Sequence, residues 1–229
     1  MAKKKSVIIL GASRGLGLAL VEEYCAVDYD VVATVRSPSP ALEQLHERFP
    51  SSLRIKSADT TDPDSIARLK DEFQESEFDT LFVNAGICIA RDNTPIDVAE
   101  SDFVALMLTN ALSPMRVVET FRDRVSPRGV IAVMSSEIGS IQINKGKWEM
   151  YSASKAALNM LMKCFAARHE GDSRALLLVA PGWVRTEMGG EEATLSIEES
   201  IPNVVKSVEA QAGKAGLRFI DRHGKTVPW

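Results

Sequence analysis

The sequence has few of the residues that build metal centres and disulfide frameworks. It contains 3 cysteines and 3 histidines among 229 residues, and Cys25, Cys88 and Cys164 lie far apart, in no CxxC or Cys/His spacing. An odd number of separated thiols predicts neither paired disulfides nor a zinc site. We therefore expect free thiols and no metal.

The sequence also lacks a long apolar run and an excess of positive charge. The run Val7–Leu10 is ended by Gly11 and Arg14, and no stretch approaches the roughly 18 apolar residues that span a bilayer. With no export signal after the first lysines, we expect a cytoplasmic protein without a membrane partner. Lys and Arg number 27 against 31 Asp and Glu, so no global positive field would gather nucleic acid.

Length and composition predict one globular domain over residues 1–229. The chain is 45% apolar and 25% charged, which is the usage of an ordinary globular protein. A single core can grow to this size. No Gly/Ser-rich or Pro-rich linker, internal repeat or low-complexity tract divides the sequence.

Short β-branched or apolar runs recur along the chain and predict buried strands. These runs are Val7–Leu10, Val31–Val35, Leu53–Ile55, Thr80–Val83, Val130–Met134 and Ala175–Val179. Segments with helical spacing lie between them, and Ser39-Pro40 and Asp62-Pro63 have the pattern of an N-cap followed by proline at the first helical position. This alternation predicts an α/β fold, a doubly wound parallel sheet with helices on both faces.

A glycine-rich loop follows the first predicted strand. Gly11, Gly15 and Gly17 stand between that strand and a helical pattern. Glycines there let the chain turn tightly and let a pyrophosphate approach the N–H groups at a helix N-terminus. The loop alone is weak evidence for a dinucleotide, because glycine turns are common.

Further motifs follow in the order that is typical of the short-chain dehydrogenase/reductase family. The loop has the spacing GxxxGxG, and later come Asp59-Thr60, Asn84-Ala85-Gly86, Asn110, Ser136, the YxxxK residues Tyr151 and Lys155, and Pro181-Gly182. Over residues 11–186 the chain therefore resembles this family. Its closing segment resembles the short-tailed branch of C-factor and sniffer-type carbonyl reductases. The resemblance implies a Rossmann fold and a nicotinamide cofactor.

The YxxxK pair also has a direct physical interpretation. Residues four apart share a helix face, so we expect the Lys155 ammonium near the Tyr151 phenol, where a cation lowers the phenol pKa. By resemblance, Tyr151 is the general acid or base, Ser136 holds the carbonyl oxygen and Lys155 also binds the nicotinamide ribose. The resemblance also implies that Asn110 helps to hold a water that relays the proton to solvent.

The serine assignment rests on its place in the chain. The serine-to-tyrosine spacing is longer here than is common in the family, and Ser135 and Ser140 lie near Ser136. We choose Ser136, because it keeps the family's place in the Ser-Ser pair after the strand. A turn at Asn144 and Gly146 is expected to absorb the extra residues.

The end of the second strand predicts the cofactor. NAD-preferring sites place an acid there, whereas this strand ends Val35-Arg36-Ser37. Arg36, with Arg14 in the glycine loop, suits a 2′-phosphate, because guanidinium groups match phosphate geometry. We therefore predict NADP(H). The resemblance places cofactor contacts at Gly11, Ser13, Arg14, Gly15, Leu16, Gly17, Arg36, Asp59, Thr60, Asn84, Ala85, Gly86, Tyr151, Lys155, Pro181, Gly182, Val184 and Thr186.

These motifs predict an NADPH-dependent oxidoreductase that reduces an aldehyde, ketone or quinone to an alcohol, or runs the reverse reaction. Its partner would be a small carbonyl or alcohol substrate. The alternative is a low-turnover NADP(H)-binding signalling or regulatory protein on the same fold. We expect a short substrate lid at about 187–196, before a helix that begins at Ile197. By resemblance, we expect a dimer.

Overall fold

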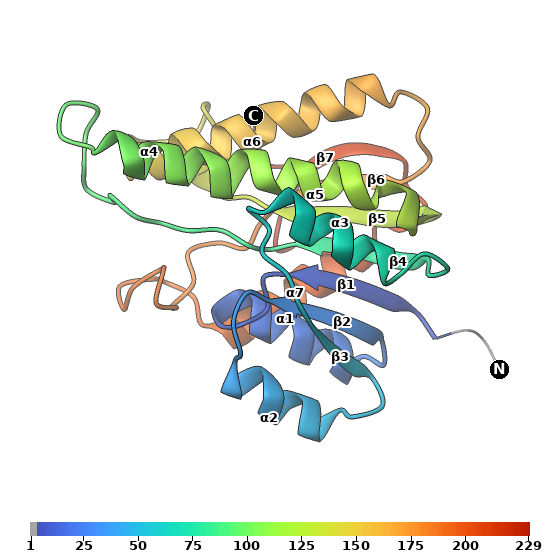
Figure 1. Ribbon diagram of the computed structural model, residues 1–229. Helices are drawn as coiled ribbons and strands as arrows, with labels where there is room; N and C mark the ends of the chain where they lie inside the picture. The colour runs from blue at the N-terminus through green and yellow to red at the C-terminus, as the bar shows by residue number, and fades with distance from the viewer. Residues whose placement is uncertain (1–3) are drawn as a thin grey trace.

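The computed structural model describes residues 4–229 and is built on a seven-stranded sheet in the order β3-β2-β1-β4-β5-β6-β7 (Figure 1). All neighbouring strands are parallel. The strands are β1 (Ser6–Leu10), β2 (Asp30–Val35), β3 (Leu53–Ser57), β4 (Phe78–Val83), β5 (Val125–Met134), β6 (Ala175–Ala180) and β7 (Gly216–Asp221). The first six contain the runs that the sequence predicts as strands, so the doubly wound fold is confirmed.

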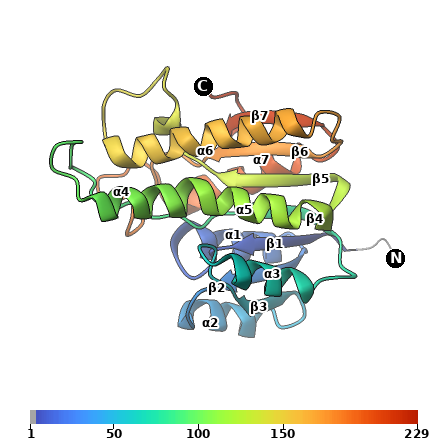
Figure 2. The same ribbon diagram turned by 45° about the horizontal axis from the view of Figure 1, so that its top comes forward.

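Helices cover both faces of the sheet, as Figure 2 shows. They are α1 (Gly15–Ala26), α2 (Pro40–Arg48), α3 (Pro63–Asp71), α4 (Glu100–Met107), α5 (Ser113–Phe121), α6 (Glu149–Arg168) and α7 (Ile197–Glu209). Helices α1, α2 and α7 pack on one face, and α3, α5 and α6 pack on the other. The two expected N-caps are present, because the side chain of Ser39 accepts from Leu42 N and that of Asp62 accepts from Asp64 N.

The central strand β1 supplies side chains to both layers of the core. Val7 and Ile9 belong to the cluster under α1 and α7, whereas Ile8 and Leu10 belong to the cluster under α5 and α6. All four side chains are fully buried, and each such burial contributes about 1.5–3 kcal/mol to folding. This packing on both faces fixes the carboxyl end of β1, and therefore the start of the glycine-rich loop, relative to the rest of the sheet.

A π-helical turn, Leu108–Leu112, joins α4 to α5. Pro114 stands near the start of α5 and has no N–H to donate to the main-chain oxygen of Asn110, four residues earlier. Loss of that bond favours a wider turn, and π-turns are frequent at functional sites. Asn110 lies within this turn, so the helix is irregular at a residue that the sequence motifs mark.

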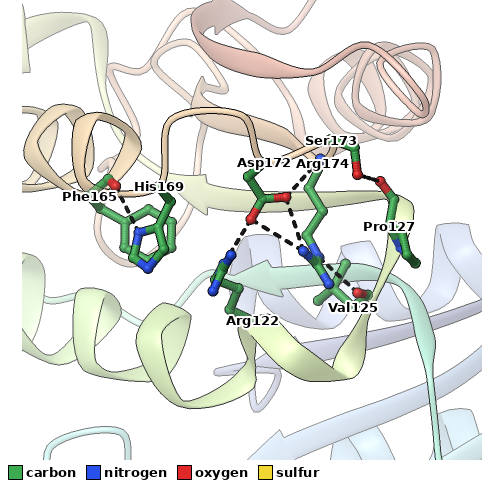
Figure 3. Close-up of polar contacts among 8 residues, drawn as sticks. All are labelled: Arg122, Val125, Pro127, Phe165, His169, Asp172, Ser173 and Arg174. Carbon is green, nitrogen blue, oxygen red and sulfur yellow. Dashed lines mark hydrogen bonds and ion pairs between the residues drawn. The ribbon is translucent and has the colours of Figure 1, made fainter.

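A buried carboxylate ties together the amino ends of β5 and β6 (Figure 3). The side chain of Asp172 is 3% exposed and accepts from Arg122 Nε at 2.7 Å and from Arg174 Nη1 at 3.0 Å, while Arg174 Nε donates to Val125 O at 2.8 Å. Burial raises the pKa of Asp172, but hydrogen bonds from Arg174 and Arg122 outweigh burial and hold it below its usual value. This cluster lies at the edge of the sheet opposite the glycine loop, so it stabilises the fold rather than the site.

Three further observations on the described residues concern membrane insertion, cysteine thiols and metal binding. Within residues 4–229 no helix is long and apolar enough to cross a membrane. The three cysteines are free thiols, with Cys25 buried, Cys88 half-buried and Cys164 exposed. In the same range, no group of three or more His, Cys, Asp or Glu side chains could hold a metal ion.

Candidate active site

Most residues marked by the sequence motifs come after the carboxyl ends of four adjacent strands, β1, β4, β5 and β6, whereas Arg36 and Asp59 follow β2 and β3. Strands β1 and β4 are neighbours in the sheet, although two strands separate them in the chain. At such a switch point the connections leave in opposite directions and open a crevice, which is where ligands bind in doubly wound sheets.

The glycine loop forms one wall of this crevice. Gly11 has φ +89°, and a Cβ there would lie 2.7 Å from the Cα of Ala85. A Cβ on Gly17 would lie 2.0 Å from the main-chain oxygen of Gly11. That same oxygen accepts a hydrogen bond from Asn84 Nδ2 at 2.8 Å. The backbones of the two loops therefore meet without side chains between them, which suits the close approach of a pyrophosphate.

The amino end of α1 opens onto this wall. Arg14 is the N-cap residue and makes no side-chain capping hydrogen bond, so the first N–H groups of the helix suit an anion. Its guanidinium pairs with Glu187 at 2.7 Å, and both side chains are about three-quarters exposed. Leu16, by contrast, packs against the core, so any cofactor contact from Leu16 would come from its main chain.

The expected adenosine end lies beyond β2 and β3. Asp59 accepts from the Thr61 hydroxyl at 2.7 Å and from Thr61 N at 2.8 Å. The Thr61 hydroxyl is the main cause of the lowered pKa of Asp59, and the charge of Arg36 lowers it further. The exposed Arg36 thus lies within electrostatic reach of Asp59, while Ser39 Oγ donates to Ser13 O at 2.7 Å.

Helix α6 places Tyr151 and Lys155 together under the crevice. Tyr151 is 8% exposed and Lys155 is 3% exposed. The Lys155 Nζ lies 5.7 Å from the centroid of the Tyr151 ring and donates to the main-chain oxygen of Met134 at 2.9 Å. The spacing of four residues therefore puts both groups on one helix face, as predicted.

The pKa values of this pair differ from the sequence expectation. Burial raises the pKa of Tyr151, and repulsion from Cys88 in its thiolate form raises it further, against a lowering hydrogen bond with Ser136. Burial lowers the pKa of Lys155 to about 8. The expected lowering of the Tyr151 pKa by Lys155 is thus absent between these two described residues, because the ammonium lies over the ring and burial dominates.

The structure places the Ser136 side chain within hydrogen-bonding reach of Tyr151. Ser136 is half-buried and is the second residue after β5, and its hydrogen bond lowers the Tyr151 pKa. Ser135 instead donates to Asn159 Oδ1 at 2.7 Å. The extra residues before α6 form the expected turn, in which Asn144 Oδ1 accepts from Gly146 N at 2.6 Å and Gly146 has φ +81°.

Asn110 ties the segment after β4 to α6. Its Oδ1 accepts from Ile87 N at 2.8 Å, and its Nδ2 donates to Ile87 O at 2.8 Å and to Ser154 Oγ at 3.0 Å. Both amide N–H donors are therefore used within the protein. A water-holding role for Asn110 would need its main-chain oxygen, which the π-turn and Pro114 deprive of an α-helical donor.

Two polar residues of α6 that the motifs do not mark also order the site. Ser154 is fully buried, accepts from Asn110 and donates to Tyr151 O at 2.7 Å. Asn159, 4% exposed, links Ser135 to Gly139 O. The sequence carries a signal for these two residues, because Ser154 and Asn159 lie on the same helix face as Tyr151. Polar side chains on a buried helix face are expected to have hydrogen-bond partners.

The segment after β6 adjoins the glycine loop. Pro181 O accepts from Ser200 Oγ at 2.7 Å, and Gly182 has φ +86°. Val184, 4% exposed, forms a β-bridge with Leu195. Thr186 is close to the glycine loop, because a Cβ on Gly15 would lie 3.8 Å from its Cγ2. The structure thus places Thr186, after β6, beside the glycine loop that follows β1.

An apolar wall surrounds the tyrosine. Leu106, Met150 and Tyr151 form a buried cluster, against which Ile87, Cys88, Val98, Ile138 and Trp148 pack. Burial raises the pKa of the Cys88 thiol, so it favours the neutral form. Met150 fills the core, whereas Trp183 is 36% exposed.

Fold and site together define a Rossmann-type α/β protein with a buried tyrosine–lysine pair beside a glycine-rich loop. The family model described as short chain dehydrogenase matches residues 5–195. The chain therefore belongs to the short-chain dehydrogenase family, and it is an oxidoreductase of that family.

Known proteins resemble the chain along most or all of its length. A short-chain dehydrogenase/reductase from Burkholderia multivorans with bound NADP is 48% identical with a TM-score of 0.97, and the match covers 99% of this chain and 100% of that chain. A carbonyl reductase from Pseudomonas aeruginosa PAO1 in complex with NADP is 38% identical with a TM-score of 0.93, at the same coverage. C-signal of Myxococcus xanthus is 32% identical over 158 residues, which are 66% of this chain and 92% of that protein.

Proposed function

We propose that the protein is an NADPH-dependent carbonyl reductase that converts an aldehyde, ketone or quinone to an alcohol. The observation that carries this proposal is the juxtaposition of the Tyr151 and Ser136 hydroxyls with the Lys155 ammonium at the carboxyl edge of the sheet. Two similar structures contain NADP, and one of them is named a carbonyl reductase, which supports both the cofactor and the reaction.

The residues of this chain would supply the proton and the orientation, while a bound nicotinamide would supply the hydride. Tyr151 donates its phenolic proton to the carbonyl oxygen, and Ser136 donates a hydrogen bond to the same oxygen. A phenol with the ordinary pKa of about 10 is already neutral at pH 7, and burial raises the pKa of Tyr151 further, so the phenol holds the proton that a general acid donates in the reductive direction. Lys155 is protonated below its pKa of about 8 and would donate to ribose hydroxyls.

Loss of the Tyr151 hydroxyl tests the reaction. We expect Tyr151→Phe to lower kcat by about 10²–10⁴-fold, the usual contribution of a general acid, while NADPH still binds. NADPH oxidation across a panel of aldehydes, ketones and quinones measures turnover, and nucleotide fluorescence measures binding. Tyr29→Phe removes a phenol at the opposite edge of the sheet and serves as the control. Turnover that survives in Tyr151→Phe would contradict the proposed role.

NADP(H) is the proposed cofactor because of the charge at the end of β2. No acid follows Val35, and the exposed Arg36 could pair with a 2′-phosphate. We expect Arg36→Ala to weaken NADPH binding about tenfold, as loss of a charge-assisted pair does, and to leave NADH binding unchanged. An unchanged ratio of the two dissociation constants would refute this role for Arg36.

The likeness to C-signal favours, as a second candidate, a low-turnover NADP(H)-binding protein that signals or regulates. The panel above separates the two functions. NADPH binding without turnover that depends on Tyr151 would establish the second candidate in place of the first.

We further propose a dimer in the cytoplasm. Helices α4–α5 and α6 lie side by side on one face of the sheet (Figure 2) and expose the apolar side chains of Phe103, Val104, Leu112, Met160 and Leu161. Such surfaces suit pairing with a second copy. Free thiols suit a reducing compartment. Light scattering on a size-exclusion column measures the mass, and Val104→Glu is expected to yield monomers.

A further inference from the structure

Three segments that are far apart in the chain meet beside Tyr151. Arg91 comes from the connection after β4, Trp148 from the residue before α6, and Met188 from the segment after β6. The guanidinium carbon of Arg91 lies 4.4 Å from the centroid of the Trp148 ring. The same guanidinium donates to the main-chain oxygen of Met188. One side chain therefore connects the segment after β6 to the start of the helix that holds Tyr151 and Lys155.

Trp148 is placed so that its position affects the site. Its ring meets the Tyr151 ring edge-on at a centroid distance of 6.1 Å. Its backbone has φ +52°, a left-handed conformation that a bulky residue keeps only where its surroundings hold it. The stacked guanidinium is one of those surroundings, because an arginine over an indole face gains both contact area and cation–π attraction.

The expected lid, at about 187–196, has a second link to the Trp148 ring. Trp183 Nε1 donates to Gly189 O at 2.9 Å, and the Trp183 ring lies edge-on to Trp148 at 6.2 Å. The lid is thus held by a charged donor on one side and an indole N–H on the other. Of these two donors, Arg91 carries the charge, and hydrogen bonds from charged donors are the stronger kind.

We propose that Arg91 is a positioning residue that fastens the lid to Trp148 and thereby closes the substrate site. The proposal rests on the carbonyl reductase function for its kinetic consequence, whereas the contact between Arg91 and Trp148 is observed directly. Arg91 takes no part in proton or hydride transfer. Its loss would release the lid and the Trp148 ring, so substrate would be held less well while the chemical step stays intact.

The contact can be tested in the ligand-free protein. In a Trp229→Phe background, Trp148 and Trp183 are the remaining tryptophans, and acrylamide quenching reports their exposure. We expect Arg91→Met to raise the quenching constant about twofold and to speed tryptic cleavage after Arg185 about tenfold, as measured by mass spectrometry. Arg91→Lys, which keeps a cation and a donor, is expected to restore most of both values.

A matched control is Arg168→Met, which removes an exposed arginine paired with Glu119 on another face. It should leave both values at the wild-type level. Equal quenching and equal cleavage in Arg91→Met and wild type would overturn the proposal. So would an effect of the same size in Arg168→Met, because the change would then reflect general loosening.

Kinetics with the neutral probe 4-nitrobenzaldehyde supply a second test. We expect Arg91→Met to raise KM about tenfold with kcat within twofold of wild type, and Arg91→Lys to recover most of the loss. A fall in kcat at unchanged KM would overturn the positioning role. If wild type reduces no carbonyl in the panel, the proposed function fails, and quenching and proteolysis still decide whether Arg91 holds the lid.

Discussion

The Nζ of Lys155 lies 2.9 Å from the main-chain oxygen of Met134. This bond holds an ammonium group inside the protein, where the side chain is only 3% exposed and its pKa falls to about 8. An unfolded lysine titrates near 10.4, so between pH 8 and 10 the unfolded chain binds more protons than the folded one. The contribution of Lys155 to the free energy of unfolding therefore rises with pH in this window.

The slope of that rise is the first prediction. We expect up to about 1.4 kcal/mol per pH unit from Lys155, and no such contribution in Lys155→Met. Urea unfolding at pH 7, 8, 9 and 10 measures it, with the exposed Lys225→Met as the control. Comparing variants at each pH cancels the effects of the tyrosines and of Cys25 and Cys88, whose raised pKa values act in the opposite direction. Parallel curves for wild type and Lys155→Met would show that the buried lysine titrates normally.

Ser154 is predicted to support catalysis through Asn110. Ser154→Ala would leave one N–H of the buried Asn110 amide without its acceptor, which costs about 1–3 kcal/mol. We expect a lower free energy of unfolding and a lower kcat, with NADPH binding preserved. Ser152→Ala removes a neighbouring hydroxyl that donates to Lys147 O and should leave kcat unchanged. Equal kcat values in Ser154→Ala and Ser152→Ala would show that Ser154 does not support catalysis.

Gly17 is predicted to tolerate no side chain. A Cβ there would lie 2.0 Å from Gly11 O, so Gly17→Ala must push the glycine loop away from Asn84 and should cost more than about 2 kcal/mol through overpacking. NADPH binding should fall with it. At Gly146, φ is +81° and a Cβ would meet nothing within 4 Å, so Gly146→Ala should cost about 1 kcal/mol. Thermal unfolding of Gly17→Ala and Gly146→Ala measures both losses of stability, the first from steric crowding and the second from backbone strain.

Asp172 is predicted to stabilise the fold in a pH-dependent way. Its folded pKa lies below the usual value, so its contribution is present above the unfolded pKa of about 3.9 and disappears as pH falls through the folded pKa. Asp172→Asn should cost about 3 kcal/mol at pH 7, because two arginines lose a buried partner. The difference should shrink toward pH 2. Asp123→Asn, from an exposed pair with Lys70, should cost under about 1 kcal/mol.

The sequence predicts those parts of the structure that depend on local pattern. A run such as Val130–Met134 can be predicted as a strand from its sequence, because strands buried on both faces of a sheet are apolar throughout. Tyr151 and Lys155 share a face because helix geometry fixes neighbours four apart. Gly11 is needed where the backbone turns with φ +89°, which a glycine in a strand-to-helix loop indicates.

Features that depend on tertiary packing could not be predicted in this way. The raised pKa of Tyr151 comes from burial by several elements, and a motif records spacing rather than solvent exposure. The contact of Arg91 with Met188 joins residues 97 positions apart. The left-handed Trp148 contradicts its own backbone preference, so only its neighbours explain it.

The π-turn at Leu108–Leu112 makes chain length in this stretch as important as residue identity. Each residue advances an α-helix by about 100°. Deleting one residue from the turn would rotate α4 by that angle relative to α5. Leu106, now fully buried, would turn toward solvent, and Asn110 would leave Ile87. A variant that keeps every motif residue could therefore lose its site when a single other residue of the π-turn is deleted.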